Sequence, residues 1–208
     1  EEPPQIEVKD ILGVDLGIVN IAADSDGGIH SGSQINGLRH RHARLRTRLQ
    51  AKGTKAAHRL LRKHSGKEKR FARHTNHCIS KKLVAKAKGT KRAIALEDLQ
   101  GIRSRLTVRK PQRRQQHSWA FAQLRAFIEY KARLAGVPVV VVDPRNTSRA
   151  CPQCGAVDRH NRLSQARFLC TSCGYAGPAD VVAATNIRER GRATVNWPDF
   201  SPAPGGVG

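Results

Sequence analysis

Short apolar runs open the chain and predict a sheet. Residues 11–17 and 18–23 are two apolar runs separated by a glycine, a pattern typical of paired strands joined by a tight turn. After a polar turn, residues 29–33 predict a short third strand before Gly32 and Gly37 break the pattern. The chain is therefore expected to begin as a β-meander.

Helical spacing of apolar residues dominates the middle of the chain. Leucines recur at this spacing over residues 38–88, which predicts two helices joined near Ser65 and Gly66. Another helix is predicted over residues 118–135, because its apolar positions fall mostly on one face and Gly136 is placed to end it. Such a helix should pack on the sheet.

Two later apolar runs predict further strands. Residues 93–96 predict a buried strand that ends at Glu97. The β-branched run 137–142 predicts a central strand covered on both faces. A last helix is expected over residues 179–190, closed by Gly191. Together these elements predict an α/β fold with a mixed sheet and a helical insert.

Charge indicates the partner. The 208 residues include 38 Lys and Arg against 16 Asp and Glu, a net charge of +22, so a polyanion such as DNA or RNA is expected. Residues 39–92 alone hold 20 Lys or Arg and one acid, Glu68, and would repel one another strongly without that partner. Few aromatic residues are interleaved, so phosphate contacts should dominate.

Two basic segments are therefore candidates for nucleic-acid contact. The first segment lies within residues 39–92, and its alternative is a solvated helix face. The second lies within residues 101–114, and its alternative is a plain solvated loop. Four arginines of the cysteine segment, at positions 149, 159, 162 and 167, are expected to contact nucleic acid or guide a strand. The predicted contact residues of the two basic segments are Arg41, Arg44, Arg48, Lys52, Arg59, Arg62, Lys63, Arg103, Arg105, Arg109, Lys110, Arg113 and Arg114.

Other features narrow the class of protein. No window approaches about 18 consecutive apolar residues, and no basic-then-apolar leader is present, so neither a membrane span nor a secretory signal is expected. Four of the five cysteines fall in close CxxC pairs, which favours metal binding over disulfides and therefore a reducing, cytoplasmic setting. No small-molecule cofactor is expected. Methionine is absent, even at position 1, so we expect a fragment, a processed chain or an excised domain.

The sharpest motif is a set of four cysteines with the spacing CxxC-x15-CxxC. They are Cys151, Cys154, Cys170 and Cys173. Four thiolates at about 2.3 Å complete a closed tetrahedral shell, so the predicted ion is a structural Zn²⁺. The alternatives are chance pairs or a redox dithiol. The fifth cysteine, Cys78, is expected to be a small buried hydrophobic residue in a helix.

Three acids lie at the ends of apolar elements. Asp15 falls inside the first strand, Glu97 ends the strand over 93–96, and Asp180 begins the last helix. Carboxylates gathered at one sheet edge are what a nuclease with two Mg²⁺ or Mn²⁺ ions needs. The spacing alone leaves an alternative, in which the first two acids are half-exposed strand-end residues and the third is a helix N-cap.

Four ordered stretches together resemble the OrfB or TnpB-type transposon-associated nucleases, relatives of the type V CRISPR effectors. These stretches are 13–27 (GVDLGIVNIAADSDG), 94–102 (IALEDLQGI), 117–155 and 169–187 (LCTSCGYAGPADVVAATNI). The resemblance implies an RNase H-like (RuvC) fold split around a zinc ribbon, in a prokaryotic, nucleoid-associated protein. It also implies that Asp15, Glu97 and Asp180 are the first, second and third catalytic acids, which cleave DNA under the direction of a guide RNA derived from the transposon end.

The resemblance divides the chain into parts. They are a nuclease part at 1–148 with a basic helical insert at about 38–92, a zinc ribbon at 149–176, a last nuclease motif at 177–191 and a disordered tail at 192–208.

Departures from the family pattern leave two other functions open. Family members carry a long part ahead of the first motif, whereas 14 residues precede Asp15 here, so guided targeting is expected to require more than these residues. The family's last motif has Asp-Arg-Asp and then Asn two residues on, whereas here Asp180 follows Pro178-Ala179 and Val182 stands at the Asn position. The alternatives are a non-catalytic DNA- or RNA-binding remnant or regulator and an integrase-like strand transferase.

Overall fold

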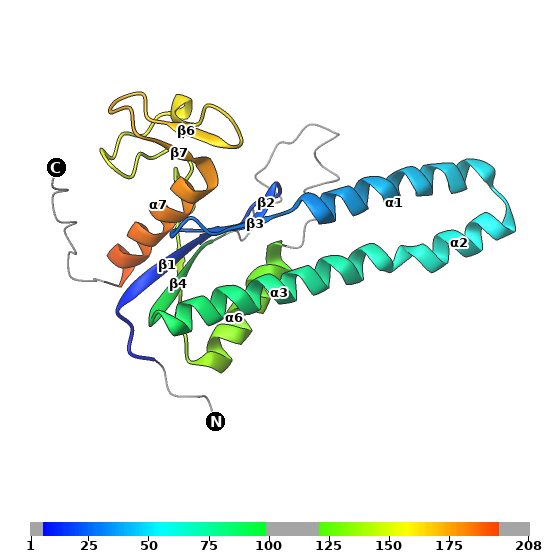
Figure 1. Ribbon diagram of the computed structural model, residues 1–208, viewed down its shortest axis with the longest axis horizontal. Helices are drawn as coiled ribbons and strands as arrows, with labels where there is room; N and C mark the ends of the chain where they lie inside the picture. The colour runs from blue at the N-terminus through cyan, green and yellow to red at the C-terminus, as the bar shows by residue number, and fades with distance from the viewer. Residues whose placement is uncertain (1–5, 99–120, 196–208) are drawn as a thin grey trace.

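A mixed sheet forms the centre of the computed structural model, which describes residues 6–98 and 121–195 (Figure 1). Its described strands run in the order β3-β2-β1-β4-β5. The first three strands pair antiparallel, whereas β4 lies parallel to both β1 and β5. The bounds are β1 (Asp10–Asp15), β2 (Asn20–Asp24), β3 (Ile29–Ser31), β4 (Arg92–Glu97) and β5 (Val139–Val142). The predicted mixed α/β fold is confirmed.

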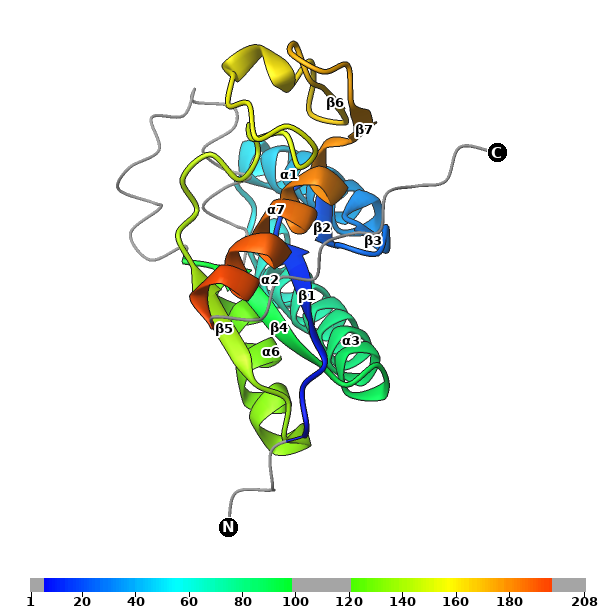
Figure 2. The same ribbon diagram turned by 90° about the vertical axis from the view of Figure 1, so that its left-hand side faces the viewer.

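Alternating side chains of the two central strands cover both faces of the sheet. On one face Ile11 and Ala95 pack with Ile187 of α7 (Ala179–Thr194). On the other face Leu12 and Leu96 join the cores of α3 (Lys67–Gly89) and α6 (Phe121–Ala135). Figure 2 shows this sandwich, with α7 and the pair α3 and α6 on opposite sides of β1 and β4. Burial on both faces fixes the register of the strands.

The basic insert is a helical hairpin that extends away from the sheet (Figure 1). It contains α1 (Ser33–Lys52), α2 (Lys55–Ser65) and the first part of α3. The predicted junction near Gly66 is present, but a second break at Gly53 was missed. Gly53 ends α1 with a φ of 62°, and the hydroxyl of Thr54 accepts from the backbone N–H of Ala57 to start α2.

Three sequence-based expectations were wrong in detail. The valine run does not form a central strand, because β5 is an edge of the described sheet and Val141 is 41% exposed. Gly37 does not break the pattern but lies inside α1. Cys78 is exposed on α3, with its sulfur 3.6 Å from Nε2 of His74. Apolar composition and β propensity alone do not distinguish such edge and surface positions from the core.

The last helix also runs farther than expected. Gly191 does not close α7, which continues to Thr194, so residues 192–194 of the predicted tail are helical. A Cβ at Gly191 would lie 2.9 Å from the Cβ of Ala95, so glycine here permits close packing of the helix on β4. Val195 is the C-cap of the helix, and the remaining tail residues, 196–208, lie outside the described residues.

The cysteine segment forms a small unit beside the start of α7. It contains a single-turn helix, η1 (Arg159–Asn161), and a two-stranded antiparallel sheet of β6 (Arg167–Leu169) and β7 (Ala176–Pro178). Strand β7 leads directly into α7, so this unit is joined by its backbone to the helix on the sheet. Among the described helices, none has both the length and the apolar character needed to cross a bilayer.

Candidate functional site

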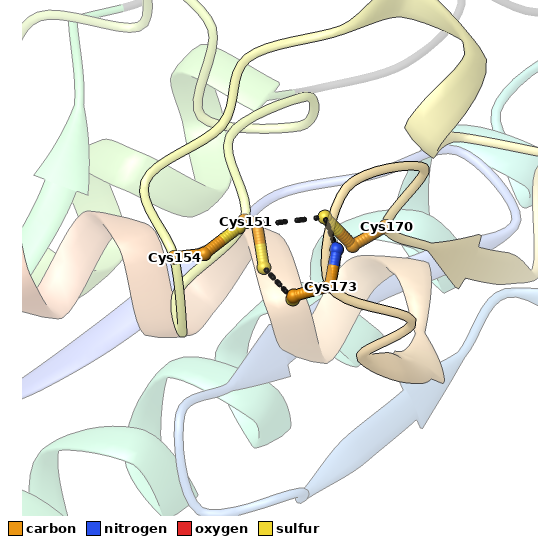
Figure 3. A group of neighbouring side chains, drawn as sticks. All are labelled: Cys151, Cys154, Cys170 and Cys173. Atoms are coloured by element: carbon orange, nitrogen blue, oxygen red, sulfur yellow. Dashed lines mark hydrogen bonds between the residues drawn. The ribbon is translucent and has the colours of Figure 1, made fainter.

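The four predicted zinc ligands meet between two loops of the cysteine unit (Figure 3). Their sulfur atoms all lie within 4.8 Å of one another. The Sγ atoms of Cys151 and Cys173 are 3.6 Å apart, as are those of Cys154 and Cys170. Four ligands at about 2.3 Å from a tetrahedral centre would be separated by about 3.8 Å, so the cluster fits Zn²⁺.

Backbone groups also prepare one of the four sulfurs, that of Cys170, for a cation. The N–H groups of Cys173 and Ser172 each donate to Sγ of Cys170 at 3.4 Å. These bonds, first that of Cys173 and then that of Ser172, lower the pKa of the Cys170 thiol to about 6. A thiolate held by backbone donors is the form that binds a metal ion.

A small core attaches the cysteine unit to α7. Phe168 is fully buried and packs with Cys151, Cys170, Ala179 and Val182. The N–H of Ala179 donates to the carbonyl of Ala166 at 3.0 Å. The unit is therefore fastened to the first turn of the helix that carries Asp180.

The structure brings the three predicted acids to one edge of the sheet. Parallel strands β1 and β4 pair Val14 with Leu96, and the next residues along these strands are Asp15 and Glu97. Asp180 stands in the first turn of α7, which packs across the same strands. It does not cap the helix: the N-cap is Pro178, and no side chain makes a capping bond there. The N-cap alternative is therefore wrong.

The pKa values of two of the acids are raised. Burial, the charge of Glu97 and then the charge of Asp180 raise the pKa of Asp15 from its usual value to about 8. Burial also raises the pKa of Glu97, although a hydrogen bond from Thr147 opposes that effect. Crowded, partly desolvated carboxylates of this kind favour either a bound proton or a bound cation.

Asp180 has two polar partners from distant parts of the chain. Arg162 of the cysteine unit places a guanidinium nitrogen 3.1 Å from Oδ1, and Nδ2 of Asn20 donates to Oδ2 at 2.8 Å. The Asp180 side chain is 8% exposed. The cation of Arg162 therefore pairs with the third acid in this structure, and its expected role in contacting nucleic acid or guiding a strand stays a prediction.

The acid cluster is looser than the cysteine cluster. Within the described residues, the four cysteines are the one group of three or more Cys, His, Asp or Glu side chains whose ligand atoms all lie within 4.8 Å of one another. One small ion held by three carboxylates needs such closeness, but two ions about 3.5–4 Å apart spread their ligands over a wider space. The ligand atoms of the three acids therefore do not all lie within 4.8 Å of one another, as those of the cysteines do.

Sequence reasoning missed the polar residues that hold the acids. Asn20, Thr147 and Asn186 are short polar side chains in or beside the stretches that carry the family resemblance. Their contacts cross 160 residues for Asn20 with Asp180 and 50 residues for Thr147 with Glu97. No local signal in the sequence marks these pairs, because each contact forms only when the fold brings the two residues together.

The structure places seven of the predicted nucleic-acid contacts on the basic hairpin. Four lie on α1 and three on α2, all are exposed, and none of them is ion-paired with an acid among the described residues. Free surface cations at this density would attract phosphates. These residues are Arg41, Arg44, Arg48, Lys52, Arg59, Arg62 and Lys63. The other six, at positions 103–114, lie outside the described residues.

Sequence comparisons find relatives for this chain. The Cas12f1-like TNB domain family matches residues 121–187. A TnpB-like protein of Methanocaldococcus jannaschii is 39% identical over 129 residues, which make up 62% of this chain and 46% of that protein. The CRISPR-associated endodeoxyribonuclease Cas12f1 of Sulfoacidibacillus thermotolerans is 40% identical over 121 residues, which make up 56% of this chain and 26% of that protein.

A structural comparison agrees on the fold. The cryo-EM structure of a Cas12f1-sgRNA-target DNA complex is similar with a TM-score of 0.64 at 22% identity, over 88% of this chain and 51% of that chain. At this identity the likeness establishes the fold alone. The present chain spans about half, or less, of the length of these relatives. The matches in sequence and fold identify the chain as a relative of the TnpB-like and Cas12f-type proteins.

Proposed function

We propose that this chain carries the nuclease site of a TnpB- or Cas12f-type DNA endonuclease, which hydrolyses DNA phosphodiesters and is guided by RNA in its longer form. One observation carries the proposal. Three acids separated by more than 80 residues in sequence meet at one sheet edge, where burial and then the charges of Glu97 and Asp180 raise the pKa of Asp15. The proposal agrees with the matched Cas12f1, which is named an endodeoxyribonuclease.

In this proposal Asp15, Glu97 and Asp180 hold two Mg²⁺ or Mn²⁺ ions. Their oxygen-only side chains suit hard divalent cations. Burial and the neighbouring acids raise the pKa of Asp15, so its ionised form is costly unless a cation compensates the charge. When bound, the ions would activate a water and stabilise the leaving oxygen. The protein's own contribution is to hold the carboxylates in place, with Asn20 fixing one oxygen of Asp180.

The cysteine unit has a structural role in this proposal. Its four sulfurs would fill all four positions around Zn²⁺, which leaves none for a substrate or water. The unit would hold the first turn of α7, and with it Asp180, through the core around Phe168. Zinc would therefore support the acid cluster without taking part in hydrolysis.

DNA and a guide RNA are the proposed partners. The seven exposed cations of α1 and α2 stand on a hairpin that extends from the nuclease fold, where phosphates can approach from the solvent (Figure 1). A similar fold occurs in a protein solved with sgRNA and target DNA. Phosphate contact by this hairpin would give affinity with little choice of sequence.

A second function, nucleic-acid binding without cleavage, is favoured by the surroundings of Asp180. Arg162 already neutralises this acid, and Val182 stands where an Asn would be expected. If the cation of Arg162 stays in place when nucleic acid binds, the third ligand of the metal site is unavailable. This alternative predicts salt-sensitive binding and no metal-dependent cutting.

Nicking of supercoiled and single-stranded DNA by the purified, zinc-loaded chain would test the proposal, with Mg²⁺ present or omitted. We expect Mg²⁺-dependent cutting that falls roughly 100-fold or more in Asp15→Asn. Glu129→Gln is the matched control, because it makes the same carboxylate-to-amide change on α6, where Glu129 pairs with Arg125. Undiminished cutting by Asp15→Asn would refute the assignment. Binding without cutting by the unmodified chain would support the second function.

A further inference from the structure

The loop between β5 and the first cysteine contacts the second acid. The side chain of Thr147 is 3% exposed, and its hydroxyl donates to Oε1 of Glu97. The same hydroxyl lies 3.1 Å from the carbonyl oxygen of Pro144, which can share the proton. This is a side-chain hydrogen bond to Glu97 from outside the group of acids, and it fixes one of the two carboxylate oxygens.

The backbone of this loop is folded to present the threonine. Asn146 has a φ of 61°, a left-handed conformation that asparagine tolerates better than most residues. Its carbonyl accepts from the N–H groups of Arg149 at 3.0 Å and Ala150 at 2.9 Å. Strained positions in a loop persist when the surrounding contacts hold them, and they concentrate at functional sites.

Helix α7 holds the loop from the other side. Asn186 is 7% exposed, and its Nδ2 donates to the carbonyl of Thr147 at 2.7 Å and to that of Ala150 at 2.8 Å. Both amide hydrogens are therefore used on one short stretch of backbone. The next residue, Cys151, belongs to the four-cysteine cluster, and its N–H donates to the carbonyl of Ala156 at 2.9 Å.

We infer that Thr147 is a positioning residue for the metal-binding carboxylate of Glu97, and that Asn186 and the cysteine cluster hold Thr147 in place. Resting on the proposed function, this inference adds a physical connection from the cysteine cluster to the acid cluster. Glu97 is the last residue of β4, and the hydrogen bond from Thr147 favours the rotamer that places Oε1 against the loop. Partners that orient metal ligands commonly change metal affinity 10- to 100-fold when they are removed.

Binding of Mn²⁺ to the zinc-loaded chain without nucleic acid would test the inference. Electron paramagnetic resonance measures the Mn²⁺ that stays free in solution. We expect Thr147→Val to weaken Mn²⁺ binding about 10-fold, since valine keeps the shape of the side chain but cannot donate. Thr147→Ser keeps the hydroxyl and should bind within about two-fold of the unmodified protein. Thr185→Val is the matched control, because that hydroxyl bonds the carbonyl of Val181 within its own helix.

Cleavage kinetics give a second reading of the same variants. Thr147→Val should lower kcat and leave KM for DNA unchanged, and Thr147→Ser should restore kcat. The inference fails if Thr147→Val binds Mn²⁺ like the unmodified protein while Glu97→Gln does not, a result that leaves the proposed function intact. If Glu97→Gln also leaves Mn²⁺ binding unchanged, the metal site itself is wrongly assigned and both proposals fail.

Discussion

Arg162 of the cysteine unit forms an ion pair with Asp180 at the start of α7, with 3.1 Å between the guanidinium nitrogen and Oδ1. The two residues are 18 positions apart and belong to different parts of the fold. Arg162 also lowers the pKa of Asp15, against the effect of the neighbouring acids. A cation from the cysteine unit therefore compensates part of the negative charge of the acid cluster.

Removal of this cation should strengthen divalent-cation binding. In Arg162→Met, the carboxylate of Asp180 loses its competing partner, and we expect Mn²⁺ affinity at pH 9 to rise roughly 3- to 10-fold without nucleic acid. Arg167→Met is the control, because Arg167 is an exposed arginine on β6 of the same unit. This variant should leave the Mn²⁺ affinity unchanged. Weaker Mn²⁺ binding by Arg162→Met would mean that the arginine orients Asp180 for the ion and does not compete with it.

The raised pKa of Asp15 predicts a pH-dependent cost to folding. Its pKa of about 8 lies above the unfolded value near 4, so between these two pH values the native state keeps a proton that the unfolded state releases. Stability from this group is therefore present at low pH and is lost as pH rises from about 4 to about 8.

Asparagine at position 15 should remove this cost. The unfolding free energy of Asp15→Asn minus that of the unmodified protein should be larger at pH 8.5 than at pH 5. Without added Mg²⁺ or Mn²⁺, we expect this difference to increase by roughly 2–4 kcal/mol from pH 5 to pH 8.5. Urea unfolding at both pH values would measure the gain, with Glu129→Gln as the control. An equal difference at the two pH values would show that Asp15 does not titrate in this range.

Much of the fold could be predicted because its signals are local. The short apolar runs in β1 and β4 mark two strands, and the CxxC spacing marks the cysteine unit. The break at Gly53 was missed although a Gly-Thr pair is a plausible helix stop and start, because the basic, leucine-containing pattern continues through it. The edge position of β5 was missed because a strand's neighbours are not encoded in its own residues.

The site could be predicted only in part, for a related reason. The motif positions indicated the acids, and the resemblance gave them an order. Their partners depend on tertiary contacts: Asn20 reaches an acid 160 residues away, and Thr147 reaches one 50 residues away. No hydrophobic period or local motif encodes such pairs, so only the folded sheet edge reveals them.

Loss of zinc should unfold the ribbon before it affects the sheet. We expect Cys170→Ser to lose bound zinc and to lose amide-exchange protection at Cys151 and at residue 170, whose N–H groups bond Ala156 and Tyr175. Amides of β1 should stay protected, because the sheet core is separate from the small core of the ribbon. Zinc analysis with hydrogen exchange would measure both effects.

The exposed fifth cysteine provides the control for this experiment. Cys78→Ser should keep one zinc per chain and unchanged exchange, since Cys78 lies on α3 outside the cluster. Retention of a full zinc ion by Cys170→Ser would contradict a four-sulfur site.

Close contact between β1 and α7 makes Gly13 intolerant of any side chain. A Cβ at this position would lie 2.0 Å from the carbonyl oxygen of Ala184 and 2.6 Å from the backbone nitrogen of Arg188. Both atoms belong to the backbone of α7, so they cannot move aside without shifting the helix that carries Asp180. We expect Gly13→Ala to cost roughly 3 kcal/mol or more, or to prevent folding.

Gly89, unlike Gly13, has open space where a side chain would lie. It ends α3 with no atom within 4 Å of its added Cβ, so Gly89→Ala should be neutral or stabilise the protein by up to about 1 kcal/mol. Thermal and urea unfolding of the two variants would compare the same chemical change in a tight and an open setting. If Gly13→Ala matched the stability of Gly89→Ala, α7 would have to lie farther from β1, and Asp180 farther from Asp15, than the structure places them.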